Sequence, residues 1–183
     1  DLQALRLGGI LHDVGKIGVP EAVLNKPGPL SKEEWELMKG HAELGYKICL
    51  PLMESLGPAL DVIRHHHEKL DGSSYPDGLK GREIPLGARI MAVADAYDSI
   101  TSERPYRKAA SHRYAVKEII RCSGAQFDPE VVEHFLEISN ALAQEQGQGR
   151  PGAPPRDLRQ AHDVGVEAAL ADRRHDRLHP RRD

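Results

Sequence analysis

Apolar residues recur at every third or fourth position in several stretches of the chain, which is the spacing of amphipathic helices. The pattern is clearest over residues 86–101. Further helices are expected at residues 2–14, at residues 32–49 and from about Pro58 to the histidines at 65–67. Aromatic residues make up only 4% of the chain, so Leu, Ile, Val and Ala must build the core. This composition favours helices over a β-sandwich and predicts an all-α fold.

Residues that commonly start helices agree with this periodicity. Ser31 and Glu34 form a capping-box pattern at the start of the helix expected at residues 32–49. Ser111 is placed to open a later helix. Asp128, followed by proline, supplies an N-cap and an N1 proline for a last helix that continues through Leu142.

Two stretches break the helical pattern. Residues 69–85 contain three glycines and two prolines, which predicts a long loop, and long loops inside compact domains are commonly functional. From about Gln144 the sequence GQGRPGAPPR cannot continue a helix, and the remainder has few large apolar residues. We therefore expect one domain at residues 1–143, followed by a linker and flexible C-terminal tail at 144–183.

Charge, cysteines and hydropathy argue against several protein classes. The 183-residue chain has a net charge of −3 and no basic block, which argues against a nucleic-acid-binding protein. Cys49 and Cys122 fit no CxxC pattern, which indicates reduced core thiols in a cytoplasmic protein. No apolar run approaches the ~20 residues of a membrane span, so this segment is expected to make no direct membrane contact. The chain begins with Asp1 rather than methionine, and we expect a sensor or receiver domain upstream.

The segment HDVGKIGVP at residues 12–20 holds the densest group of reactive side chains. Its His12 and Asp13 can give an imidazole nitrogen and a bridging carboxylate to metal ions, and Lys16, one turn later, can hold a phosphate. The pair alone is weak evidence, because HDVG also occurs at 162–165. Only the first copy is followed by a lysine and by further ligand candidates downstream.

Together with downstream histidines and an aspartate, this pair suggests a metal centre. Asp95 stands within the apolar run of a predicted helix, where a lone carboxylate would be costly. Mixed imidazole and carboxylate ligands favour Fe, Mn, Zn or Ni over Ca or Mg. A single histidine or aspartate of this kind is usually a cap or a surface group, so the hypothesis rests on joint occurrence. The candidate ligands are His12, Asp13, His41, His66, His67 and Asp95.

Three cationic residues follow the segments that hold these ligands and could bind phosphate oxygens: Lys16, Arg104 and Arg107. For any one of them a solvated surface cation is the simpler interpretation. The loop segment DGSSYPDG could close over the same site, although an ordinary surface turn would have a similar composition.

Five segments occur along residues 3–142 in this order: HDVGKIGVP, LNKPGPLSKEEWELMKGH, HHEKLDGSSYPDGLKGREIP, ARIMAVADAYDSITSERPYR and GAQFDPEVV. Their order and spacing closely resemble the HD-GYP family, which are cyclic di-GMP phosphodiesterases of the HD phosphohydrolase superfamily. The resemblance implies an HD-domain helical bundle with two or three divalent transition-metal ions, usually iron or manganese. It also implies hydrolysis of cyclic di-GMP to pGpG and GMP in bacterial signalling, with GGDEF-type proteins as partners.

Carried over by position, the six candidate ligands match the family's metal ligands, with Asp13 bridging. Lys16, Tyr75, Arg104 and Arg107 match positions that contact substrate, whereas His65 falls outside the ligand set. We expect an activated water to attack phosphorus in line, with Lys16 also catalytic. Two alternatives stay open: an HD phosphohydrolase of another nucleotide, and a catalytically weak cyclic di-GMP receptor.

Two departures from the family pattern bear on these expectations. Ser74 replaces the first glycine of Gly-Tyr-Pro, and a serine forced to positive φ would cost on the order of 1 kcal/mol or reshape the loop. The family also supplies a histidine ligand from a helix before the His-Asp pair. Residues 1–11 contain no histidine, so that ligand is expected upstream of this sequence.

Overall fold

A computed structural model describes residues 2–103 and 108–147. Eleven helical segments are formed in these ranges, and the described residues contain no β-strand, so the predicted all-α fold is confirmed. The α-helices are α1 (Leu2–Leu11), α2 (Glu21–Leu24), α3 (Lys32–Cys49), α4 (Met53–Leu56), α5 (Ala59–His65), α6 (Leu86–Thr101), α7 (His112–Cys122) and α8 (Pro129–Gly147). The short 3-10 helices are η1 (Val14–Gly18), η2 (Leu50–Leu52) and η3 (Gly81–Glu83).

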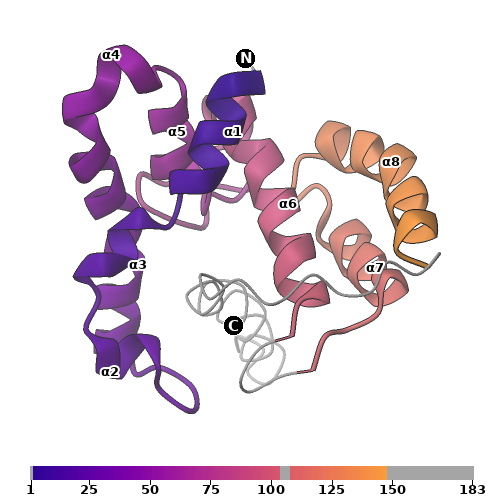
Figure 1. Cartoon of the computed structure of the whole chain (residues 1–183), viewed down its shortest axis with the longest axis horizontal. Coiled ribbons are helices and arrows are strands. Elements are labelled where there is room, and N and C mark those ends of the chain that lie inside the picture. The colour runs from indigo at the N-terminus through magenta and orange to yellow at the C-terminus, as the bar shows by residue number, and fades with distance from the viewer. Residues whose placement is uncertain (1, 104–107, 148–183) are drawn as a thin grey trace, which may run out of the picture.

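Three apolar clusters build the core of the described residues, and α6 lies between the two larger ones (Figure 1). The first joins α1, α3, α4 and α5 around buried residues such as Leu60 and Ile63. The second joins α6, α7 and α8 around Val93, Ile119 and Phe127. Helix α6 contacts α1 and α5 on one side and α7 and α8 on the other. The side chains of α6 therefore reach both halves of the described chain.

Several helix starts form where the sequence predicts them. The Ser31 hydroxyl accepts a hydrogen bond from the Glu34 amide, and the Glu34 carboxylate accepts one from the Ser31 amide, which completes the capping box of α3. Ser111 caps α7 through the Tyr114 amide. Both cysteines are free and buried, as expected for core thiols.

The first helix is shorter than the predicted 2–14, which is a correction with consequences for the site. Helix α1 ends at Leu11, and Asp13 leaves helical geometry with φ −100° and ψ 4°. The chain then tightens into η1, where the Lys16 amide donates to the Asp13 carbonyl at 2.9 Å. Helix α8 in turn continues past Leu142 to Gly147. The short helices α2 and α4 have too few residues for a periodic pattern to predict them.

Candidate metal centre

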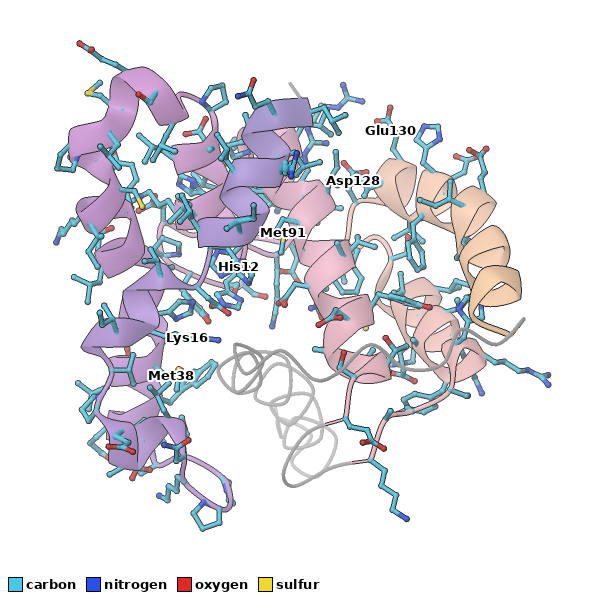
Figure 2. All side chains as sticks on the ribbon, viewed as in Figure 1. His12, Lys16, Met38, Met91, Asp128 and Glu130 are labelled. Atoms are coloured by element: carbon cyan, nitrogen blue, oxygen red, sulfur yellow. The ribbon has the colours of Figure 1, made fainter. Side chains whose placement is uncertain are left out.

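The predicted ligands come together from four parts of the fold, one of which is α6. His12 and Asp13 lie in the turn after α1, His41 lies in α3, and His66 and His67 follow the end of α5. Asp95 comes from the middle of α6. Figure 2 shows His12 and Lys16 on the side of α1 and η1 that faces α6. All of these side chains except Asp13 and His67 belong to buried residues, and those two are half-buried.

A close backbone approach seats the Asp13 turn against α3. A Cβ atom added to Gly15 would lie 1.9 Å from the His41 carbonyl oxygen and 2.4 Å from the Gly45 amide nitrogen. Only glycine allows η1 to pack this tightly on the helix that supplies His41. The result is that Asp13 Oδ1 lies 3.4 Å from His41 Nε2.

Three imidazole nitrogens and one carboxylate oxygen converge at a single point. One potential ligand atom from each of Asp13, His41, His66 and His67 lies within 4.8 Å of the others. His41 Nε2 is 3.4 Å from His66 Nε2 and 3.2 Å from His67 Nε2. Two nitrogens that each lie about 2.1 Å from one ion are separated by roughly 3.0–3.4 Å, so these spacings fit a shared metal ion.

The other ring nitrogens show which atoms are available for a metal. Nδ1 of His12, His41 and His66 lies 2.8, 2.7 and 2.9 Å from the carbonyl oxygens of Gly9, Met38 and Ile63, respectively. A carbonyl only accepts, so each Nδ1 bears the proton and donates it. The Nε2 atoms of neutral rings then present lone pairs toward one another, an arrangement that is repulsive unless a cation lies between them.

Burial keeps these rings neutral, which is the form that binds metal. Removal from water lowers the pKa of His66 to about 3. Burial lowers the pKa of His67 well below its usual value and also lowers that of His41. His41, His66 and His67 therefore remain neutral at pH 7 inside the folded protein.

The two oxygens of Asp13 face different neighbours. Oδ1 lies beside His41, whereas Oδ2 lies 3.2 Å from His12 Nε2 and 2.9 Å from Lys16 Nζ. Asp95 Oδ1 is 4.0 Å from His12 Nε2, on the same side as Asp13 Oδ2. One half of the site thus contains His41, His66 and His67, and the other contains His12 and Asp95. Lys16 is 7% exposed, so the interpretation of this lysine as a solvated surface cation is wrong.

The 69–85 loop brings Tyr75 to the edge of this cluster. The Tyr75 ring lies 5.0 Å from the His67 ring, at an interplanar angle of 34°. Its hydroxyl is shielded from solvent and has no hydrogen-bond partner within the described residues. Burial raises the pKa of Tyr75, and the charges of Asp13 and Asp95 raise it further. The phenol therefore remains protonated and can donate a hydrogen bond.

The predicted strain at Ser74 is wrong. Positive φ in this loop is confined to Gly72, Gly78 and Gly81, and no non-glycine residue in the described ranges has positive φ. Ser74 therefore has a backbone conformation that serine adopts without penalty.

Some candidate residues lie elsewhere, and others were missed. Arg104 and Arg107 lie outside the described residues. His65 lies 2.9 Å from Asp77 rather than in the cluster, as expected for a residue outside the ligand set. Glu68 was not predicted, although it is 3% exposed and one of its oxygens has no hydrogen-bond partner in the described part of the chain. Its position directly after two histidines was the available signal.

Comparison with known proteins identifies the family. Residues 1–131 match the family described as HD domain. This chain belongs to the HD-domain family. Helical HD-domain proteins of this kind bind divalent metals, in agreement with the His and Asp cluster. None of the described helices combines the length and apolar character that a bilayer-spanning segment requires.

The resemblance to HD-GYP proteins is confirmed by named relatives. The chain is 46% identical over 136 residues to a cyclic di-GMP phosphodiesterase of Thermotoga maritima, covering 72% of this chain and 36% of that protein. It is 39% identical over 128 residues to the 3′3′-cGAMP-specific phosphodiesterase 2 of Vibrio cholerae, covering 69% of this chain and 24% of that protein. The HD-domain chain thus spans between a quarter and about a third of the length of these relatives.

A solved structure supports the fold. A crystal structure of a cyclic GMP-AMP-specific phosphodiesterase of Vibrio cholerae matches with a TM-score of 0.54 and 23% sequence identity. The match covers 98% of this chain and 50% of that one. At this identity the likeness concerns the arrangement of the helices.

Proposed function

We propose that this HD domain is a metal-dependent phosphodiesterase that hydrolyses cyclic di-GMP to pGpG, GMP or both. The observation that supports it most is the convergence of the Nε2 atoms of His41, His66 and His67 beside Asp13. That arrangement is unfavourable in a metal-free core and favourable around a divalent ion. The name of the Thermotoga relative supplies the substrate.

The split of the site into two halves supports a centre for two ions, which the family resemblance implies are iron or manganese. His41, His66 and His67 would hold one ion, His12 and Asp95 would hold the other, and Asp13 would contribute to both. Divalent ions bound there would supply a hydroxide nucleophile at neutral pH and would stabilise negative charge on phosphate oxygens.

Two side chains beside the ligands suit a phosphodiester. Lys16 Nζ, 2.9 Å from Asp13 Oδ2, places a positive charge at the edge of the centre, where it holds a non-bridging phosphate oxygen. Tyr75 is protonated and has no hydrogen-bond partner among the described residues, so it can donate its hydroxyl hydrogen to a substrate oxygen or to a water bound to the substrate. Arg104 and Arg107 are proposed as further phosphate contacts on the strength of their motif alone.

A second candidate substrate is 3′3′-cGAMP, because a relative of comparable identity is named as specific for it. Both cyclic dinucleotides present the same phosphodiester ring to the metal centre and differ in one base. A domain that binds cyclic di-GMP without turnover is the remaining alternative.

The organisation around the catalytic site is part of the same proposal. We propose that the domain predicted at residues 1–143, extended to the end of α8 at Gly147, acts as the catalytic unit, and that an upstream receiver or sensor domain and GGDEF-type proteins act with it in the cytoplasm. These assignments come from composition and from the family resemblance.

The deciding experiment compares substrates on metal-loaded protein. Cyclic di-GMP, 3′3′-cGAMP and a linear dinucleotide are incubated separately, and products are identified by chromatography and mass. Asp13→Ala should abolish turnover, whereas Asp163→Ala, in the second HDVG copy, should match the wild type. Faster turnover of 3′3′-cGAMP would favour the second candidate, and binding of cyclic di-GMP without product would favour the receptor.

A further inference from the structure

The loop that holds Tyr75 is tied to α5 by an ion pair of two hydrogen bonds. Arg64 Nε donates to Asp77 Oδ2 and Arg64 Nη2 donates to Asp77 Oδ1, each at 2.9 Å. A guanidinium and a carboxylate joined in this way fix each other's orientation as well as their distance. The Arg64 hydrogen bonds hold down the pKa of the Asp77 carboxyl, so the pair stays charged at neutral pH.

Arg64 is itself anchored between two helices. It belongs to the last turn of α5, its Nη1 donates to Glu43 of α3, and its guanidinium lies 5.0 Å from the centre of the Tyr46 ring. Arg64 therefore fixes the loop relative to α3 and α5. Three of the clustered histidines lie in α3 or directly after α5.

Asp77 is held a second time through its backbone. Its amide donates at 2.8 Å to Glu68 Oε1, and Glu68 is buried directly after His67. His65 Nε2 also lies 2.9 Å from Asp77 Oδ2. Contacts to Asp77 thus come from residues on both sides of the ligand pair His66 and His67.

We infer that Arg64 and Asp77 are positioning residues: together they clamp the loop so that Tyr75 stays over His67 at the substrate-facing edge of the metal centre. Tyr75 lies two residues before Asp77, and no group in the described residues hydrogen-bonds the Tyr75 hydroxyl. This inference rests on the proposed function in treating Tyr75 as a substrate contact. The clamp acts on the loop and touches no clustered ligand atom, so its loss should weaken substrate binding and leave the metal in place.

The test uses Arg64→Ala, Arg64→Lys and Asp77→Asn in the metal-loaded full chain, with Arg121→Ala as the matched control. Arg121 likewise donates two hydrogen bonds to a carboxylate, that of Glu118, but both of these residues belong to α7. Losing a paired, charge-assisted contact should raise KM for cyclic di-GMP about ten-fold, with kcat within about two-fold and metal content unchanged. Arg64→Lys keeps the charge without the fork and should fall between wild type and Arg64→Ala.

Trp35 gives a readout that does not depend on turnover. It is the only tryptophan, and its ring lies 6.0 Å from that of Tyr75. Release of the loop should increase quenching of its fluorescence by acrylamide in Arg64→Ala and Asp77→Asn but not in Arg121→Ala. Unchanged quenching in both clamp variants, or a loss of metal as large as the loss of activity, overturns the inference. If the wild type hydrolyses no cyclic dinucleotide, the proposed function fails while Trp35 quenching still decides whether the clamp exists.

Discussion

Replacing Gly15 by alanine should remove metal from the centre without removing a ligand. The added Cβ would lie 1.9 Å from the His41 carbonyl oxygen, whereas ordinary van der Waals contacts begin at 3.4 Å. The segment containing Asp13 and the helix containing His41 must therefore separate by about 1.5 Å, far more than the ~0.2 Å tolerance of metal–ligand distances. Overpacking of this kind costs about 1–3 kcal/mol. A domain with a typical stability of ~5–15 kcal/mol should remain folded.

The assay for Gly15→Ala measures metal per protein over a series of free-metal concentrations, with circular dichroism as the check on folding. We expect the helical spectrum to persist and metal affinity to fall by about 10- to 100-fold, the range seen when ligand orientation is disturbed. Gly40→Ala is the control, because it lies next to His41 in α3 and its Cβ would meet nothing within 4 Å. Wild-type metal affinity in folded Gly15→Ala, or equal losses in the two variants, would refute the packing argument.

Three further predictions follow from the site. Lys16→Ala should lower turnover by about 10- to 1,000-fold, because it removes a charge near the reacting phosphate. It should lower metal affinity less than Asp13→Ala does. Equal losses of metal in the two variants would make Lys16 purely structural. Ser74→Gly should leave KM and kcat unchanged, since Ser74 has no positive φ to relieve; a gain in affinity would contradict this. Below pH 6.5 the unfolded chain takes up a proton that buried His66, with its pKa lowered to about 3, does not. As the pH is lowered from 6.5 to 3, the free energy of unfolding of the metal-free protein should therefore fall by ~1.4 kcal/mol per pH unit for this histidine. Urea titration at each pH measures this change. A free energy of unfolding that does not change with pH would contradict the burial of His66 as a neutral ring.

Local signals in the sequence predicted much of the fold. The Ser31 and Glu34 capping box fixed the start of α3, and apolar spacing gave α6 its bounds, because both signals act within a few turns of one helix. The end of α1 at Leu11 was missed, because it depends on the packing of Gly15 against α3, a contact between segments far apart in sequence.

The sequence indicated which candidate ligands would lie together, but not how the surrounding residues hold them in place. Asp13, His41, His66 and His67 were expected as ligands and do converge. The division of the site into two halves by the two Asp13 oxygens could not be predicted, since it needs atomic positions. The same holds for Arg64 and Asp77, whose pairing depends on how the loop folds back on α5.

The most direct test of the metal-dependent phosphodiesterase is a reconstitution titration. Metal-stripped wild-type protein is supplied with Mn²⁺ or, without oxygen, with Fe²⁺, and hydrolysis of cyclic di-GMP is followed against bound metal, with Asp13→Ala alongside. We expect no turnover without metal, a rise in turnover that levels off near two bound ions, and neither tight metal binding nor turnover in Asp13→Ala. Turnover in the stripped protein, or wild-type turnover in Asp13→Ala, would contradict it.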